Sequence, residues 1–255
     1  LEGLKWIEML EANHSLSQKE EWQVNEMKAL LLNERGNQDE FLPIWYKLLK
    51  QYREADRPED VGKCLLTIAN HFIMLEDYEN ALPLYKEAYQ LALEHKSIEL
   101  QQVSGIMLIK YLCGARYYSE SLEYYNKIKP EIAFNPSMQN EVVKSYMELN
   151  KPDSARIYLA ARLLSERGDK IVLNCMMAET YITEELEDSA FVFLDRPMKS
   201  YKERAKNYQK KGKEPILPNC FLSPCYSFAD LLWKKGKIQQ ASQYYMIVEP
   251  LMKER

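Results

Sequence analysis

Glycine is scarce in this chain of 255 residues, and so are long apolar runs. Only 8 glycines occur, which is too few for an all-β protein that turns after about every ten residues. No apolar run approaches the roughly 18 residues that a membrane-spanning helix requires. No secretory signal peptide is visible, although the chain starts at Leu1 and not at a methionine. These absences favour a globular, helical protein and leave its cellular compartment open.

The chain also has no surplus of basic charge, since its formal net charge is −4 and its pI is near 5.6. Proteins that depend on phosphate contacts usually carry a basic surplus, so nucleic acid is disfavoured as the main partner. Hydrophobic residues make up 46% of the chain and charged residues 28%, which is typical of a globular protein. Residues that favour helices fill the long segments and predict an all-α fold.

Side chains that carry enzyme chemistry are few and poorly grouped. His14, His71 and His95 are the three histidines, and no two have the i, i+4 spacing of a helical zinc site. The sequence has no Cys-x-x-Cys, no Gly-rich phosphate loop and no Gly-x-Ser-x-Gly elbow. We therefore expect no metal, no cofactor and no catalytic residue, and the chain is not predicted to be an enzyme.

The five cysteines are an odd number, so they do not form the even set of a disulfide framework. Most lie within helical apolar patterns, where a free cysteine is a small buried hydrophobic residue. Cys220 and Cys225 lie five residues apart around Ser223-Pro224. A disulfide between these two is left open, because sequence alone does not give their geometry.

One apolar pattern recurs along the chain. Around Ala81, it places Ala69 twelve residues before, Phe72 nine before and Tyr85 four after. The same offsets surround five further anchors, which are Phe41, Ser121, Ala155, Ala190 and Ala241. Successive anchors are separated by 40, 40, 34, 35 and 51 residues. A period in this range predicts a helical repeat architecture.

The pattern resembles the tetratricopeptide repeat, a helix–turn–helix unit of about 34 residues. Residues 64–88 carry most of its signature, with Ala69 and Ala81 where the two helices cross. Phe41, Ser121 and Arg162 depart from the small residues of the family pattern. The resemblance implies a right-handed superhelical array of antiparallel helix pairs, an α-solenoid, in a single domain 1–255. Its expected parts are a covering helix at 1–13 and repeats at 17–52, 57–95, 99–130, 135–167, 169–213 and 220–255.

Local signals predict several boundaries. Ser17–Glu20 is a capping box, and Asn135-Pro136 and Ser223-Pro224 each supply a cap with a first-turn proline. The longer repeats predict helices extended by a turn or more around 51–61 and 90–103. The longest interval contains an insertion at 197–217, which is basic from Lys199 to Lys213. We interpret this insertion as an extended, solvated helix that stops at Gly212.

In this family the first helix of each pair lines a concave surface that binds proteins or peptides. The inward positions lie six and three residues before the small residue of that helix, and one and four after it. A carboxylate clamp of the chaperone-binding members is not expected, because Leu66, Val103 and Met107 replace its polar positions. The predicted partner-binding residues are Lys63, Leu66, Asn70, Ile73, Val103, Ile106, Lys110, Asn140, Lys144, Met147, Cys175, Glu179, Ile182, Tyr226, Asp230 and Trp233.

The resemblance therefore predicts a non-catalytic scaffold for a protein or peptide. Similar arrays form the sensory or partner-binding part of bacterial signalling regulators, and on that model more protein is expected after Arg255. No membrane contact is expected from this segment itself. Two alternatives stay open. One is an oligomerising module that pairs through its open C-terminal repeat at Tyr244, Tyr245 and Met246, and the other is a nucleic-acid- or anion-binding array that uses Lys199–Lys213.

Overall fold

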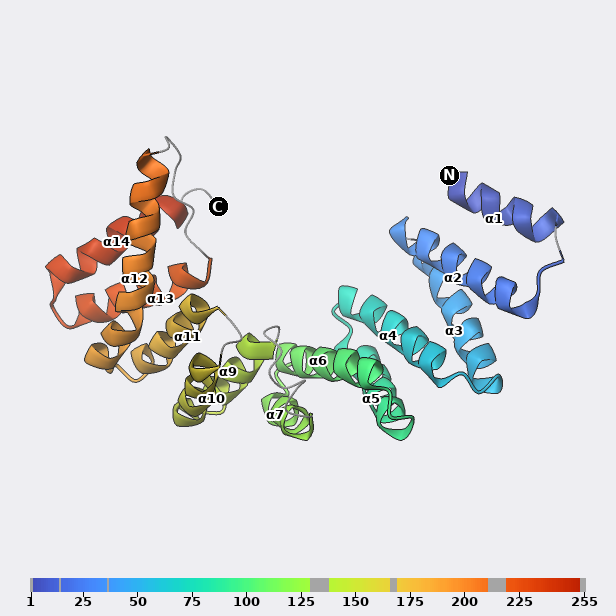
Figure 1. Ribbon diagram of the computed structural model, residues 1–255, viewed down its shortest axis with the longest axis horizontal. Coiled ribbons are helices and arrows are strands. Elements are labelled where there is room, and N and C mark those ends of the chain that lie inside the picture. Colours follow the sequence, from blue (N-terminus) through green and yellow to red (C-terminus); the bar gives the residue numbers. More distant parts are fainter. Residues whose placement is uncertain are drawn as a thin grey trace. The chain divides into compact units, whose positions relative to one another are not determined.

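The computed structural model describes residues 2–13, 15–35, 37–128, 138–165, 169–210 and 219–252. These residues form thirteen α-helices and no β-strand, so the predicted all-α fold is confirmed (Figure 1). Each helix packs mainly against helices next to it, or next but one, along the chain. The structure is therefore a helical repeat array. It divides into two compact units, Leu1–Tyr117 and Tyr118–Arg255; the right-handed superhelix stays a prediction.

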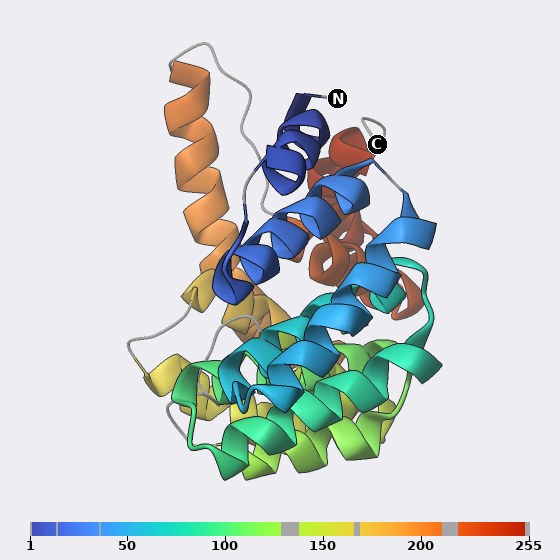
Figure 2. The ribbon, with the colours of Figure 1, turned by 90° about the vertical axis from the view of Figure 1, so that its right-hand side faces the viewer.

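The first unit is a series of antiparallel helices joined by short turns (Figure 2). Helices α2 to α6 each contain 17 residues, and they start at intervals of 20 residues. They are about one turn longer than the 13-residue helices of the second unit, which confirms the predicted extension. The helices of the first unit are α1 (Glu2–Asn13), α2 (Gln18–Glu34), α3 (Gln38–Glu54), α4 (Pro58–Met74), α5 (Tyr78–Glu94) and α6 (Ile98–Gly114).

Seven of the turns that the structure describes share one backbone geometry. In each, the N–H of the residue after the turn centre donates to the carbonyl five residues earlier, as from Asp77 to Phe72 at 2.9 Å. This bond and a left-handed central residue define the Schellman motif, which satisfies carbonyls at the end of a helix. The central residues are Asp56, Glu76, Lys96 and Arg116 in the first unit and Asn150, Glu185 and Gly236 in the second. Only one of them is glycine, so the scarcity of glycine does not disturb the turns.

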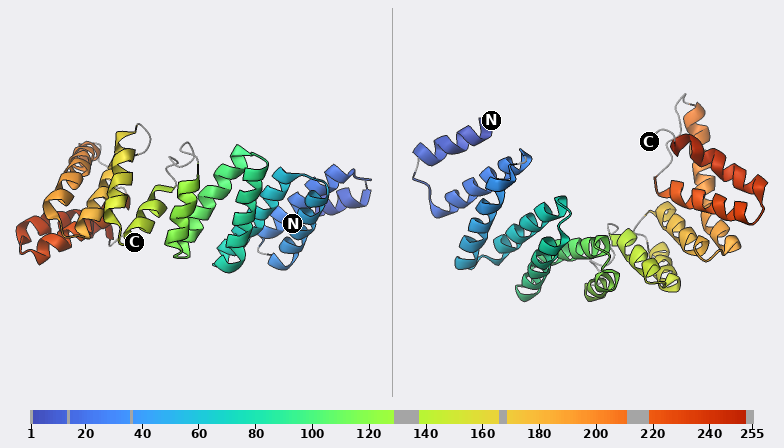
Figure 3. Two further views of the ribbon diagram at one scale, coloured as in Figure 1. Left: turned by 90° about the horizontal axis from the view of Figure 1, so that it is seen from below. Right: turned by 180° about the vertical axis from the view of Figure 1, so that it is seen from behind.

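The second unit contains helices of more varied length (Figure 3). The basic insertion continues α12 to 24 residues, which confirms its helical interpretation as far as Lys210; the predicted stop at Gly212 lies outside the described residues. The helices are α7 (Tyr118–Lys127), α9 (Gln139–Glu148), α10 (Pro152–Leu164), α11 (Lys170–Ile182), α12 (Glu187–Lys210), α13 (Asn219–Lys234) and α14 (Ile238–Met252).

Burial supports the repeat alignment. Ala69 and Ala81 are fully buried where α4 and α5 cross. All six anchors are buried, namely Phe41, Ala81, Ser121, Ala155, Ala190 and Ala241. Arg162, which replaces a small residue of the family pattern, is also fully buried on α10, close enough to Tyr158 for its charge to act on that phenol. The repeated offsets thus identify core positions even where the residue type departs from the family.

Two of the predicted helix starts are described by the structure, and one of them is wrong. The capping box before α2 is confirmed: the backbone N–H of Ser17 donates to Glu20 Oε2 at 2.8 Å, and the backbone N–H of Glu20 donates back to Ser17 Oγ. Ser223-Pro224 does not start a helix, because α13 begins at Asn219 and contains Pro224. The third predicted start, Asn135-Pro136, lies outside the described residues.

Cys225 is a free, buried thiol, so it forms no disulfide.

Buried His71 predicts a pH-dependent stability for the first unit. The imidazole is 4% exposed, and its ring centroid lies 4.9 Å from that of Phe41. Burial lowers the pKa of His71 below 6.5, since the charged imidazolium is poorly solvated there. Between this lowered pKa and 6.5, His71 therefore binds a proton in the unfolded chain but not in the folded chain. As the pH falls from 6.5 toward the lowered pKa, the free energy of unfolding should decrease by up to about 1.4 kcal/mol per pH unit.

Urea unfolding of the wild type and of His71→Leu, followed by circular dichroism between pH 7.5 and pH 5, measures this effect. The leucine variant should lose the His71 part of the pH dependence. His95→Leu is the matched control, because His95 is exposed after α5. Equal pH dependence in the wild type and His71→Leu would contradict the prediction.

Candidate functional site

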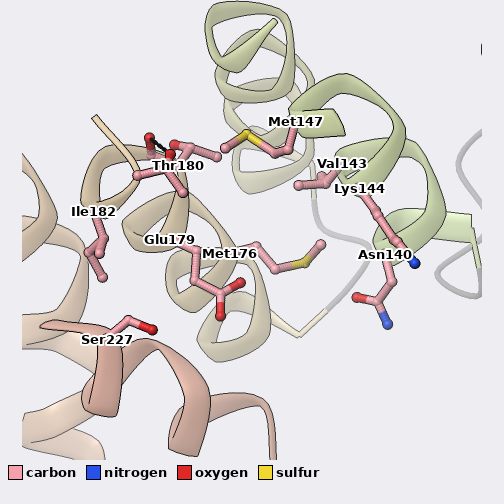
Figure 4. Close-up of a pocket in the computed structure, with 10 residues that line it drawn as sticks. Asn140, Val143, Lys144, Met147, Met176, Glu179, Thr180, Ile182 and Ser227 are labelled. Carbon is pink, nitrogen blue, oxygen red and sulfur yellow. Dashed lines mark hydrogen bonds between the residues drawn. The ribbon is translucent and has the colours of Figure 1, made fainter. Parts of the chain in front are cut away.

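The second unit contains a pocket of about 460 Å³ between α9, α11 and α13 (Figure 4). Volumes of roughly 300–1,000 Å³ are typical of ligand sites. The pocket lies on the first helices of successive helix pairs, which are the helices that the repeat pattern assigns to partner binding. Its lining residues are Asn140, Val143, Lys144, Met147, Met176, Glu179, Thr180, Ile182, Thr183 and Ser227.

Arg156 fixes how α10 packs against the end of α11. Arg156 donates to Glu184 Oε2 at 2.5 Å and to Asp153 Oδ1 at 2.6 Å. Its guanidinium also lies 4.7 Å from the ring centroid of Tyr181, near the end of α11. These contacts combine ion pairs with a cation–π interaction on one planar group. Arg156 thus holds the C-terminal end of α11, which carries the pocket residues Glu179 to Ile182.

The walls of the pocket are mostly apolar. Val143 and Met147 come from α9, and Met176 and Ile182 come from α11. The two threonines bond within their own helix, since Thr180 Oγ1 donates to the Met177 carbonyl at 2.7 Å and Thr183 Oγ1 to the Thr180 carbonyl at 3.0 Å. The O–H donors of both threonines are therefore already used within the chain. The pocket can accept an apolar side chain, and methionine adapts to the shape of such a group.

Glu179 and Lys144 bring opposite charges to the pocket. Burial raises the pKa of Glu179, and a hydrogen bond from the Ser223 hydroxyl opposes that rise. In Figure 4 the Glu179 carboxyl group lies on the α13 side of the pocket, whereas Lys144 and Asn140 extend from α9 at the other end. The carboxyl group is thus held in a poorly solvated position, away from the exposed ammonium of Lys144.

Five of the predicted partner-binding residues meet in this pocket: Asn140, Lys144, Met147, Glu179 and Ile182. Cys175 does not, because it is 1% exposed and packs in the core with Phe228 and Ala229 of α13. The prediction of Cys175 as a contact residue is therefore wrong. The repeat offsets also missed Val143, Met176, Thr180, Thr183 and Ser227. Met176 follows Cys175 directly, so the same offsets shifted by one residue along α11 would have predicted Met176.

On α13, the predicted residues lie beyond the pocket. Tyr226 is 41% exposed and Trp233 is 56% exposed, so both are accessible. Asp230 accepts a hydrogen bond from the Tyr245 hydroxyl of α14. The Tyr226 ring lies edge-on to the Tyr245 ring, with centroids 5.6 Å apart. Asp230 therefore joins α13 to α14, in addition to any role that it has in binding.

In the first unit, the predicted residues lie on α4 and α6. Lys63, Leu66 and Val103 line a smaller pocket of about 190 Å³ between these helices. Asn70 Oδ1 accepts a hydrogen bond from the buried Tyr85 hydroxyl at 2.5 Å, at the same repeat positions as Asp230 and Tyr245. The remaining predictions on these helices are half-buried (Ile73 and Ile106) or exposed (Lys110).

The two alternative surfaces lie on α14 and α12. At the C-terminal repeat, Met246 is 67% exposed, but Tyr244 is 8% exposed and belongs to the core. Tyr244 is thus not available for pairing with a second copy. On α12, Lys199 forms an ion pair with Asp195 at 2.7 Å. Across the parts of the chain that the structure describes, we find no group of three or more His, Cys, Asp or Glu arranged to hold a metal ion, and no helix with the length and hydropathy of a membrane span.

No protein-family model matches the chain, and no curated protein sequence matches it significantly. The class of protein is therefore defined by the fold alone, which is a helical repeat array.

Proposed function

We propose that the protein is a non-catalytic scaffold of the tetratricopeptide type that binds a protein segment on the first helices of its helix pairs. The α9–α11–α13 pocket is the centre of the binding surface. The observation that carries the proposal is the convergence of five residues, chosen by repeat position alone, on one pocket with apolar walls. Apolar grooves between helices suit extended or helical peptides, whose side chains enter at regular spacing.

Selection from a phage-displayed library of random peptides tests this proposal. Peptides that bind the wild type should bind Met147→Ser more weakly by about tenfold or more, because an apolar wall of the pocket is lost. Fluorescence anisotropy with the labelled synthetic peptide gives the dissociation constants.

Ile157→Ser is the matched control, since Ile157 is 72% exposed on α10 and does not line the pocket. Its affinity for the peptide should equal that of the wild type, and circular dichroism should show the same helix content for all three proteins. Peptides that bind Met147→Ser and the wild type equally would place binding elsewhere and refute the proposal.

A further inference from the structure

Glu179 differs from Glu184 and Glu187 of the second unit in the partners that the fold gives it. Glu184 pairs with Arg156 at 2.5 Å, and Glu187 lies 3.8 Å from the ammonium of Lys235. Within the described residues, no lysine or arginine forms an ion pair with Glu179, whose partner is the neutral Ser223 hydroxyl. Glu179 therefore has a negative charge that the surrounding fold does not neutralise.

The position of Glu179 makes this charge costly. It is half-buried on α11, between the pocket residues Met176 and Ile182. A raised pKa means that the ionised carboxylate is less stable there than in water. Lys144 lines the same pocket but lies at its α9 end, apart from the carboxyl group (Figure 4). A cation that enters the pocket from outside would offset this cost, and it would not have to displace an existing ion pair.

The space beside Glu179 is suited to an apolar group. Met147 of α9 and Met176 of α11 line the same pocket, and the O–H groups of Thr180 and Thr183 already donate to backbone carbonyls (Figure 4). A ligand that matches the pocket therefore carries a positive charge and an apolar side chain close together. A peptide with an acidic group in place of the cation would meet like-charge repulsion from Glu179.

We propose that the α9–α11–α13 pocket recognises a protein segment in which a lysine or arginine lies beside a large apolar side chain. The cation pairs with Glu179, and the apolar side chain fills the space between Met147 and Met176. This inference rests on the proposed function, because it specifies the chemistry of the segment that the scaffold binds.

The test uses a peptide from the phage selection, synthesised with arginine or with citrulline at its basic position. Citrulline keeps the shape of arginine but is neutral. Arginine peptide should bind the wild type about tenfold to a hundredfold more tightly than it binds Glu179→Gln, since hydrogen bonds between charged groups are the stronger ones. Citrulline peptide should bind both proteins equally.

Two controls distinguish the effect of the Glu179 charge on binding from an effect of the substitution on folding. Glu123→Gln removes a carboxylate that is exposed on α7 and does not line the pocket, so this variant should bind the arginine peptide as tightly as the wild type. Glu179→Gln removes a poorly solvated carboxylate, so its unfolding midpoint in urea should be unchanged or higher.

The outcomes distinguish this inference from the function on which it rests. If peptides need Met147 but carry no basic residue, or if Glu179→Gln leaves their affinity unchanged, the cation preference is refuted and the scaffold function stands. If no selected peptide depends on Met147, the scaffold function fails and this inference fails with it.

Discussion

Replacing Phe228 with alanine is expected to lower the free energy of unfolding of the second unit by about 3–5 kcal/mol. Phe228 is 1% exposed on α13, and its ring contacts come from two other helices. The centroid distance is 5.1 Å to Tyr244 of α14 and 6.4 Å to Phe191 of α12. The alanine variant would lose this aromatic packing and leave a cavity. The helices on its several sides cannot all shift inward to fill that space.

Urea unfolding of the full chain, followed by circular dichroism, measures the loss. Helical repeat arrays can unfold in more than one step, so the transition of the second unit is fitted separately. Val192→Ala is the control: Val192 is 65% exposed on α12, and its loss should change the free energy of unfolding by less than about 0.5 kcal/mol. Similar losses in both variants would contradict the central role of Phe228.

The core could be predicted from sequence because burial is periodic. Each repeat has small residues where its helices cross and large residues at fixed offsets from them. These offsets mark buried positions even when Phe41 or Ser121 occupies the anchor position. Glycine does not mark the centres of these turns, because Asp56, Glu76 and Lys96 adopt the left-handed geometry that glycine favours, although the predicted repeats place Asp56 and Lys96 between units. Their position follows from the bonds that end each helix.

The site could be predicted only in part. A single set of offsets assumes that every first helix turns the same face toward the partner. Helix α11 breaks this assumption because Cys175 packs into the core beside α13, so Met176 and Thr180 face the pocket instead. The bond from Tyr85 to Asn70 was also missed, although its recurrence between Tyr245 and Asp230 follows the repeat positions.

At Phe41, the tetratricopeptide pattern and the structure give opposite expectations. The pattern has a small residue at this anchor, so Phe41→Ala would restore the expected residue. In the structure, however, Phe41 is 1% exposed on α3, with its ring centroid 4.9 Å from that of His71 on α4 and 6.3 Å from that of Trp45. The ring is part of the core shared by α2, α3 and α4. We therefore expect Phe41→Ala to destabilise the first unit by about 3–5 kcal/mol.

A second measurement separates a local cavity from a general loss of structure. With the ring gone, water gains access to His71, so its pKa should return toward 6.5 and the acid-induced loss of stability should become smaller. NMR titration of the His71 imidazole in wild type and Phe41→Ala follows this change directly. Tyr46→Ala is the control on the same helix, because Tyr46 is 45% exposed and should leave both quantities nearly unchanged. If Phe41→Ala were as stable as the wild type, the small residue of the family pattern would suit this position and the packing described for the first repeat would be wrong.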